Sequence, residues 1–412
     1  MKLNMIPSKA LISRYELPFF AVFIYIVGVM MVYATQFQTF SALYYIGPLL
    51  FLYSFKSLNV LNRLQTRNIP WIYWLLMSEV FFMWLRFDIN GANGGTFQDI
   101  NGAGATFLFI TMMYRPSMLR LRYAQKWILA IIGVGILYAI YFWKDLVMGS
   151  YYISTGGFYG DNGDRYVNMA MSVGYALMSC GFLLSIQHVL SPKVKYSVLG
   201  AAVLGLIVLM VAGRRGYSVL MLCFIMLFLY STIIYSKGRQ RFYAMIFGTF
   251  FVVGSVYYFL ANMDTQFGVL MNRIDTDSRT GVFYYWDKEM GTDMFKWIFG
   301  KGVSGGYYDG DFCALRPGIE NGIRHMLLKG GVLYLIPYII IGLKAVYLAL
   351  RKSRSLFIRM LGLYVLICIC FLYVWGTPSF SFLHFCMWVS IVWIYNPQIR
   401  RMTDEQIIRH LY

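Results

Sequence analysis

Long apolar stretches separated by short polar segments recur along almost the whole chain. A helix needs about 17–25 apolar residues to cross the hydrocarbon core of a bilayer, and it satisfies its own backbone hydrogen bonds there. The pattern therefore predicts an all-α, polytopic integral membrane protein with about twelve transmembrane helices. The predicted spans lie near residues 18–35, 41–55, 70–86, 98–114, 127–144, 167–190, 195–212, 217–236, 242–261, 326–348, 356–375 and 380–395. The fourth has the weakest signal, because its first half, "FQDINGAGA", is polar and rich in glycine.

One long polar segment, residues 262–325, interrupts this pattern. Loops of that length in compact proteins are usually either functional or disordered. The chain thus divides into transmembrane helices 1–9 (residues 1–261), a large loop (262–325), and transmembrane helices 10–12 with a cytoplasmic tail (326–412).

The large loop carries the periodicity of an amphipathic helix, with Ser278 as its N-cap. Glycines at 300, 302, 305 and 306 follow this helix and predict a mobile, closely packed connection. The apolar positions of the predicted helix are Phe283, Trp286, Met290, Met294 and Trp297.

Composition and charge fix the class and the orientation. The chain is 59% hydrophobic and 13% charged, which is too little charge for the surface of a soluble protein of this size. Lys and Arg gather in alternate loops, so the positive-inside rule places both termini in the cytoplasm and the large loop outside. Topology and anionic lipid account for the net charge of +18, and no nucleic-acid partner is implied.

Arg214 and Arg215, in "GRRG", stand in a short outer turn from which the positive-inside bias would remove them. Two interpretations are open: the pair reaches lipid headgroups, or it faces an anionic ligand in a cavity. Arg279 raises the same question, because it begins a helix whose N-terminal dipole disfavours a cation without a nearby anion.

Two candidate bases lie where the large loop re-enters the membrane, Glu320 and His325. The ordinary pKa of histidine suits proton transfer near neutral pH, whereas Glu320 would need burial to raise its pKa. Either group could serve as a general base, and a structural role for His325 is equally open.

Three stretches in this order resemble the bacterial O-antigen polymerase and ligase family: "GRRGYSVLML", "SRTGVFYYWDKEM…FKWIFGKG" and "ENGIRHMLLKGGVLYLI". The resemblance implies a glycosyltransferase that takes its glycan from undecaprenyl pyrophosphate at the outer face of the bacterial inner membrane. By position in the motifs, Arg215 and Arg279 match the family's turn and loop arginines. Arginine's planar fork suits pyrophosphate oxygens, so these two, with Arg214, are the candidate pyrophosphate ligands.

Further candidate contacts to glycan or phosphate are Arg273, Arg324 and Asn321. Ligases of this family carry a histidine directly before the loop-exit asparagine, where this chain has Glu320. The difference favours a polymerase and leaves open whether Glu320 or His325 is the base. Cations can stabilise the leaving pyrophosphate in place of a metal, so neither a metal nor a cofactor is expected. The expected partners are the undecaprenyl-pyrophosphate-linked oligosaccharide and the lipid bilayer, and a chain-length regulator is a further candidate.

Two other functions stay open on the sequence alone. One is an O-antigen ligase-type transfer, and the other, from a different class, is a lipid-oligosaccharide transporter or flippase. Transporters usually show internal repeats and charged residues deep within their spans. Here Glu79 is the one clear acid inside a predicted span, and no internal repeat is visible, so the enzyme is favoured.

Overall fold

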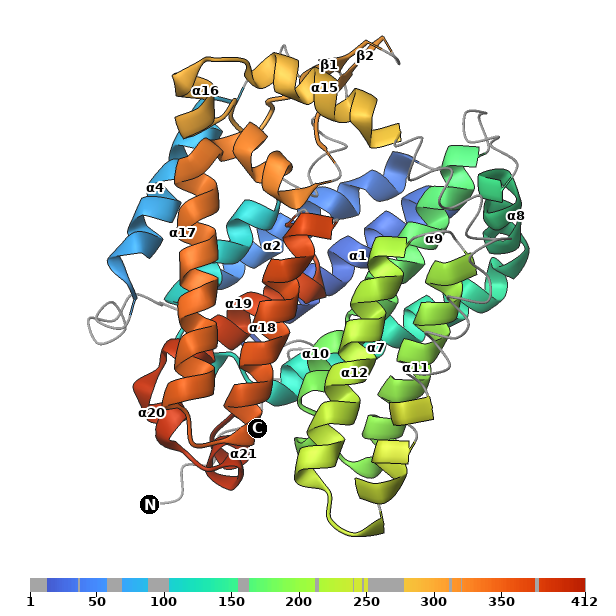
Figure 1. The fold of residues 1–412 in the computed structure, drawn as a ribbon, viewed down its shortest axis with the longest axis vertical. Helices are drawn as coiled ribbons and strands as arrows, with labels where there is room; N and C mark the ends of the chain where they lie inside the picture. The colour runs from blue at the N-terminus through green and yellow to red at the C-terminus, as the bar shows by residue number, and fades with distance from the viewer. Residues whose placement is uncertain are drawn as a thin grey trace.

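The computed structural model is built almost wholly from helices (Figure 1). It describes residues 13–35, 38–57, 69–87, 104–154, 163–211, 215–239, 241–246, 248–250, 278–310, 313–319, 321–374 and 378–411. The α-helices are α1 (Leu17–Thr35), α2 (Ala42–Ser57), α4 (Trp71–Leu85), α7 (Leu121–Tyr141), α8 (Trp143–Ser154), α9 (Gly163–Met178), α10 (Cys180–Ser185), α11 (Pro192–Val211), α12 (Arg215–Tyr235), α15 (Ser278–Met290), α16 (Met294–Phe299), α17 (Gly322–Lys352), α18 (Leu356–Val374), α19 (Phe382–Tyr395), α20 (Pro397–Arg401) and α21 (Asp404–Leu411). The remaining elements are the 3₁₀ turns η1 (Gln38–Ser41), η2 (Thr106–Met113), η3 (Pro116–Met118) and η4 (Gln187–Val189), and the strands β1 (Tyr307–Asp309) and β2 (Ala314–Arg316).

The described helices make this a multi-pass, all-α membrane protein. Seven of them are long and apolar enough to cross a bilayer: α1, α7, the continuous α9–α10 segment, α11, α12, α17 and α18. Three shorter apolar helices coincide with further predicted spans, at Thr39–Phe55, Trp71–Leu85 and Phe382–Tyr395. Hydropathy thus located these ten segments correctly. Of the ninth predicted span, residues 242–246 and 248–250 are helical and the rest lies outside the described residues.

The segment predicted as the fourth span differs from the others. Its described residues, 104–114, contain the eight-residue 3₁₀ helix η2, which rises only about 16 Å at about 2.0 Å per residue. Phe109 within it is fully buried, and the hydroxyl of Tyr73 donates to its carbonyl at 3.0 Å. Backbone that is not α-helical is tolerated at membrane depth only where protein surrounds it in this way. The helix α8 was also not anticipated, because its sequence was assigned to a loop.

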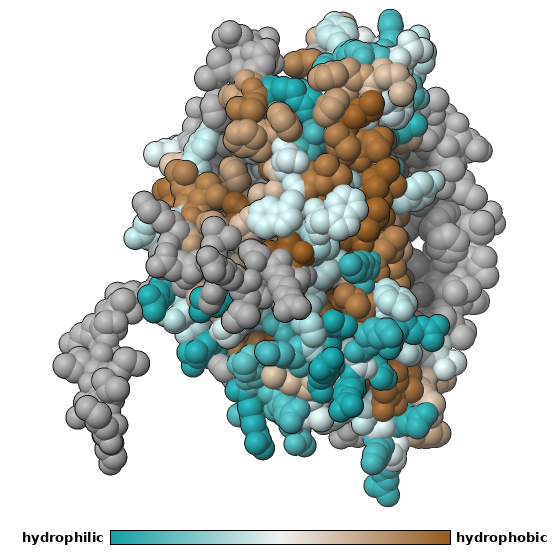
Figure 2. Space-filling view, turned by 90° about the vertical axis from the view of Figure 1, so that its left-hand side faces the viewer, coloured by the Kyte–Doolittle hydropathy of each residue, from teal (hydrophilic) through white to brown (hydrophobic). Residues whose placement is uncertain are grey.

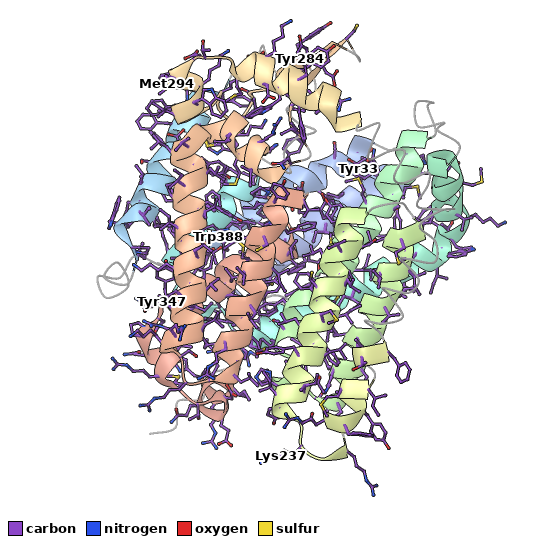
Figure 3. All side chains as sticks on the ribbon, in the orientation of Figure 1. Tyr33, Lys237, Tyr284, Met294, Tyr347 and Trp388 are labelled. Carbon is purple, nitrogen blue, oxygen red and sulfur yellow. The ribbon has the colours of Figure 1, made fainter. Side chains whose placement is uncertain are left out.

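The centre of the bundle is α19, in which every residue is buried. Trp388 packs edge-on against Phe109 and Tyr338, with ring centroids 4.9 and 5.6 Å apart. Its label in Figure 3 lies in the middle of the molecule. A helix that is apolar all round is expected at such a central position.

The two ends of the bundle differ in composition. The elements of the large loop lie at one end of the molecule, while Lys237 and the C-terminal helices lie at the other (Figures 1 and 3). On the face shown in Figure 2, hydrophilic residues gather at the end with the C-terminal helices, and hydrophobic residues cover much of the surface above. Lys237 and the C-terminal helices, both expected on the cytoplasmic side, thus lie at the same end of the molecule.

The amphipathic helix predicted in the large loop is two helices, α15 and α16, so the prediction of one continuous helix was wrong. Gly291 ends α15 with a φ of 52°, in the left-handed region that favours glycine. Asp293 then caps α16 by accepting from the backbone N of Phe295 at 2.9 Å. Ser278 is the first residue of α15 rather than its N-cap. Trp286 and Met290 are buried as predicted, whereas Met294 is exposed.

Candidate functional site

The described loop elements form a small folded unit, which we call the cap: α15, α16, the hairpin β1–β2 and their connections, residues 278–310 and 313–319. Its own core is separate from that of the bundle. The residues of this core are Trp286, Met290, Tyr307, Ile319 and Leu328, the last contributed by α17. The cap therefore rests on the first turns of α17, where the predicted base His325 lies.

Asn321 fixes the start of α17. Its side-chain oxygen accepts from the backbone N of Arg324 at 3.0 Å, which is the usual bond of an N-cap. Its Nδ2 donates to the carbonyl of Tyr373 at 2.8 Å and so ties α17 to the end of α18. Asn321 was predicted to contact glycan or phosphate, and here it makes these two bonds within the protein.

His325 lies on the first turn of α17 and is buried, with 5% of its surface exposed. Its backbone N donates to the carbonyl of Asn321 at 2.9 Å, so the N-cap residue of α17 also sets the position of His325. The imidazole lines a small cavity with room for about one water molecule. The other residues of its lining are Met83, Thr106, Val303, Lys329, Tyr334 and Pro378.

Lys329 is one helical turn beyond His325 and lines the same cavity, and the sequence analysis did not single it out. It is buried, and its ammonium donates to the carbonyls of Val303 and Gly305 at 2.9 and 3.0 Å. A charged residue four positions after His325 in an apolar segment was the available signal, because such residues share a helix face. The lysine thus binds the connection between α16 and β1 (residues 300–306), which we call the connection after α16, directly over the cavity.

Arg86, at the C-terminus of α4, is a second cation that sequence analysis missed. Its Nη2 pairs with Oε1 of the buried Glu79 at 2.7 Å and also donates to the carbonyl of Phe299 at 2.6 Å. Its Nη1 donates to the carbonyl of Gly300 at 2.9 Å. The acid that looked isolated in the sequence is therefore the anchor of an arginine that holds the end of α16.

The glycines in this region allow two backbones to lie in contact, as predicted for the residues after α16, whereas the mobility predicted for the same connection finds no support in its hydrogen bonds. Gly300 has a φ of 64°, and a Cβ there would lie 2.5 Å from the backbone N of Gly330. Gly331 has a φ of 62°, and a Cβ there would overlap the carbonyl of Ile298. Backbone N–H groups of Lys301 and Gly302 donate to carbonyls of α17 at 2.7 and 2.8 Å. These contacts fix the connection on α17.

Arg324, predicted as a further ligand contact, faces the cap. Its guanidinium lies over the rings of Phe283 and Trp286, with centroid distances of 4.0 and 4.9 Å. It also pairs with Asp287 at 3.5 Å. A cation over an aromatic ring is attracted by the ring's quadrupole, and the tryptophan is the stronger partner. Arg324 therefore joins α17 to α15.

The two motif arginines lie at helix starts. Arg215 is the first residue of α12 and Arg279 the second of α15. Both helices begin toward the end of the molecule that carries the cap (Figure 1). The side chains of Arg215 and Arg279 lie outside the described part, as do the residues Arg214, Arg273 and Glu320.

Charged contacts also organise the cap itself. Glu289 accepts from Lys301 at 2.8 Å and from Lys296 at 3.3 Å. Partial burial by itself would raise the pKa of Glu289, but the hydrogen bonds and charges of the two lysines outweigh it and lower that pKa. In the hairpin, Arg316 pairs with the buried Asp309 at 2.7 Å.

The chemistry that the described residues offer here is proton transfer, because His325 beside a cavity could accept a proton. The described cations where the cap meets the bundle, Arg86, Lys329 and Arg324, are each bonded within the protein. Among the residues that the structure describes, no group of three or more His, Cys, Asp or Glu side chains could hold a metal ion.

Compared with protein-family models, curated proteins and solved structures, the chain finds no match. The geometry of this region and the resemblance of three short motifs therefore carry the inference of function.

Proposed function

We propose that the protein is a polysaccharide polymerase of the O-antigen or capsular type. In this proposal, it transfers a glycan from undecaprenyl pyrophosphate to a lipid-linked acceptor repeat at the outer face of the inner membrane. The topology that belongs to the proposal has about twelve spans, both termini in the cytoplasm and the cap outside. The enzyme needs no metal, because arginines stabilise the leaving pyrophosphate.

The observation that carries the proposal is the cavity beneath the cap, with His325 in its wall. A folded cap on one end of a membrane bundle suits chemistry on a lipid-linked substrate, since the polar glycan stays in water and the tail in lipid. Lys329 and Arg86 hold the connection after α16 to the bundle beside this cavity. The cavity has room for about one water molecule, so in this proposal such a water relays the proton of the attacking hydroxyl to His325.

The proposed roles follow from chemistry and motif position. Arg215 and Arg279, with Arg214, bind the pyrophosphate, and His325 or Glu320 is the base. Arginine's bidentate geometry fits phosphate oxygens better than the point charge of lysine does. Arg215→Lys and Arg279→Lys should therefore lose most of the activity even though the charge is kept.

The test that separates the candidate functions is the glycan profile of a deletion strain. A polymerase defect leaves lipid that carries a single repeat unit. Polymer stranded on undecaprenyl indicates a ligase, and single repeats retained at the cytoplasmic face indicate a flippase. Either of these last two outcomes contradicts the proposal.

The base is tested with purified protein and lipid-linked repeat units. A general base contributes about 10²–10⁴-fold to a rate, so His325→Ala or Glu320→Gln should reduce turnover within that range. His410→Ala is the matched control, because His410 is exposed on α21 at the opposite end. Near-normal turnover in both variants at saturating substrate would remove proton abstraction by this segment.

Reporter fusions test the proposed orientation. Fusions at Arg239 and at Gly305 should report opposite sides of the membrane, with Arg239 in the cytoplasm. The same side for both would contradict the topology.

A further inference from the structure

The short helix α16 has two different sides. Lys296 is turned toward α15, where its ammonium donates to the carbonyl of Glu289 at 2.9 Å. Trp297 packs on the same side, with its ring centroid 5.7 Å from that of Trp286. The opposite side carries Met294, Phe295 and Ile298, all of them exposed. Three adjacent apolar side chains left in water would be unfavourable by the hydrophobic effect.

This apolar side continues the lipid-facing surface of α4. Phe81, Phe82 and Leu85 are exposed on the last turns of that helix, as expected of a membrane helix at the edge of a bundle. The hydrogen bond from Arg86 to the carbonyl of Phe299 joins the end of α4 to the end of α16 at 2.6 Å. Figure 3 shows Met294 at the outer edge of the molecule, above α4.

The level of α16 is that of a membrane boundary. It lies where α4 ends, and the guanidinium of Arg86 marks the change from apolar to charged residues. In the face shown by Figure 2, the hydrophobic surface extends upward to the cap. Apolar and aromatic residues on a helix at this level are typical of segments that lie in the bilayer interface.

We infer that the Met294–Phe295–Ile298 side of α16 is inserted among the lipids of the leaflet that adjoins the cap. These side chains contact lipid at the level where the headgroups meet the acyl chains. The cap is then held to the membrane from two sides, by α17 beneath it and by lipid beside it. The other exposed surfaces of the cap, such as those at Tyr284 and Tyr308, then face water.

Spin-label accessibility in lipid nanodiscs tests the inference and needs no enzymatic readout. The exposed cysteines Cys313 and Cys370 and the half-buried Cys223 are first replaced by Ser or Ala. A nitroxide is then placed at Phe295→Cys. The lipid reference is Phe81→Cys on α4, and the water references are Tyr284→Cys and Tyr308→Cys on the cap. The exposed fractions of the native side chains are similar: 59% for Phe295, 62% for Phe81, 61% for Tyr284 and 56% for Tyr308.

The label at position 295 should be as accessible to oxygen, and as shielded from a water-soluble nickel complex, as the label at position 81. Oxygen, which concentrates in lipid, should relax it several-fold more strongly than the water-soluble nickel complex, and the order should reverse at 284 and 308. A label at 295 that the nickel complex reaches as easily as at 308 overturns the inference. A label shielded from both reagents also overturns it, because protein then covers the site, and spin–spin broadening would identify a second copy of this chain.

Discussion

Different interactions stabilise the cap and the bundle. In the bundle, Trp388, Phe109 and Tyr338 form a continuous aromatic core around α19. In the cap, a small apolar core is supplemented by charged contacts such as Lys301–Glu289 and Arg316–Asp309. Small units bury too little apolar surface to be stable alone, so the cap depends on ionic contacts and on its attachment to α17 and α4. Changes to single charges should therefore loosen the cap and leave the bundle folded.

The largest effect is expected from Arg86→Met. The substitution leaves Glu79 buried without its partner and releases the carbonyls of Phe299 and Gly300, which should cost about 3 kcal/mol. Hydrogen exchange should rise in residues 294–306 far more than in α19. The double variant Glu79→Gln/Arg86→Met removes the unpaired charge and should recover part of the stability. Unchanged exchange in the single variant would show that Arg86 does not anchor the cap.

Gly331→Ala should weaken the same attachment through the backbone. Its φ of 62° is unfavourable for alanine, and the new Cβ would meet the carbonyl of Ile298, so we expect a loss of about 2–3 kcal/mol. The measurement is the thermal midpoint in detergent, together with limited proteolysis of the cap. Gly133→Ala in α7 is the control, because nothing lies within 4 Å of its Cβ position. Equal midpoints for the two variants would argue against the close contact.

Asp293→Ala removes the N-cap of α16 and should cost about 1 kcal/mol. The effect should appear as faster exchange at Phe295 and its neighbours. Asp293→Asn keeps an oxygen that can accept the hydrogen bond, so this variant should behave as the wild type does. Identical hydrogen exchange in the Ala and Asn variants would mean that the N-cap hydrogen bond of Asp293 does not stabilise α16.

The smallest effect concerns Glu289. Its pKa lies below the ordinary 4.5 in the folded cap, so its contribution to stability is present above that pH and is lost as the pH falls through the lowered value. Solvent screening limits this contribution to about 0.5–1 kcal/mol. Acidification from about pH 5 to 3 should destabilise the wild-type cap more than Glu289→Gln, and salt should reduce the difference. Glu405→Gln at the opposite end is the control. Parallel pH profiles of stability for the wild type and Glu289→Gln would show that the Glu289 carboxylate does not stabilise the cap.

The sequence determined the class of the protein and most of its helices. Ten predicted spans correspond to apolar helices because a membrane span must close its own hydrogen bonds within one continuous segment. That requirement is local, so it can be read from local hydropathy. The glycines after α16 also signalled a close backbone contact, although not its partner. The segment 98–114 misled the prediction, because its apolar half suits a buried 3₁₀ turn as well as a span.

Two signals in the sequence were overlooked, one within the large loop and one just after it. Gly291 and Asp293 are a typical helix end and a typical N-cap, yet the apolar period ran through them and suggested one helix. Lys329 stood one turn after His325, but nothing in its neighbours along the chain revealed that it binds the carbonyls of Val303 and Gly305. Periodicity describes one helix face at a time and carries no information on which other segment covers that face.

Only the tertiary structure decided how the candidate site is assembled. Arg86 is separated from Phe299 and Gly300 by more than two hundred residues, and its hydrogen bonds end on backbone carbonyls. A carbonyl is present in every residue, so sequence offers no pattern from which such a contact can be predicted. The same holds for the side of α16 that packs on Trp286 and the side that stays exposed. These choices depend on long-range packing, which is settled when the cap folds onto α17.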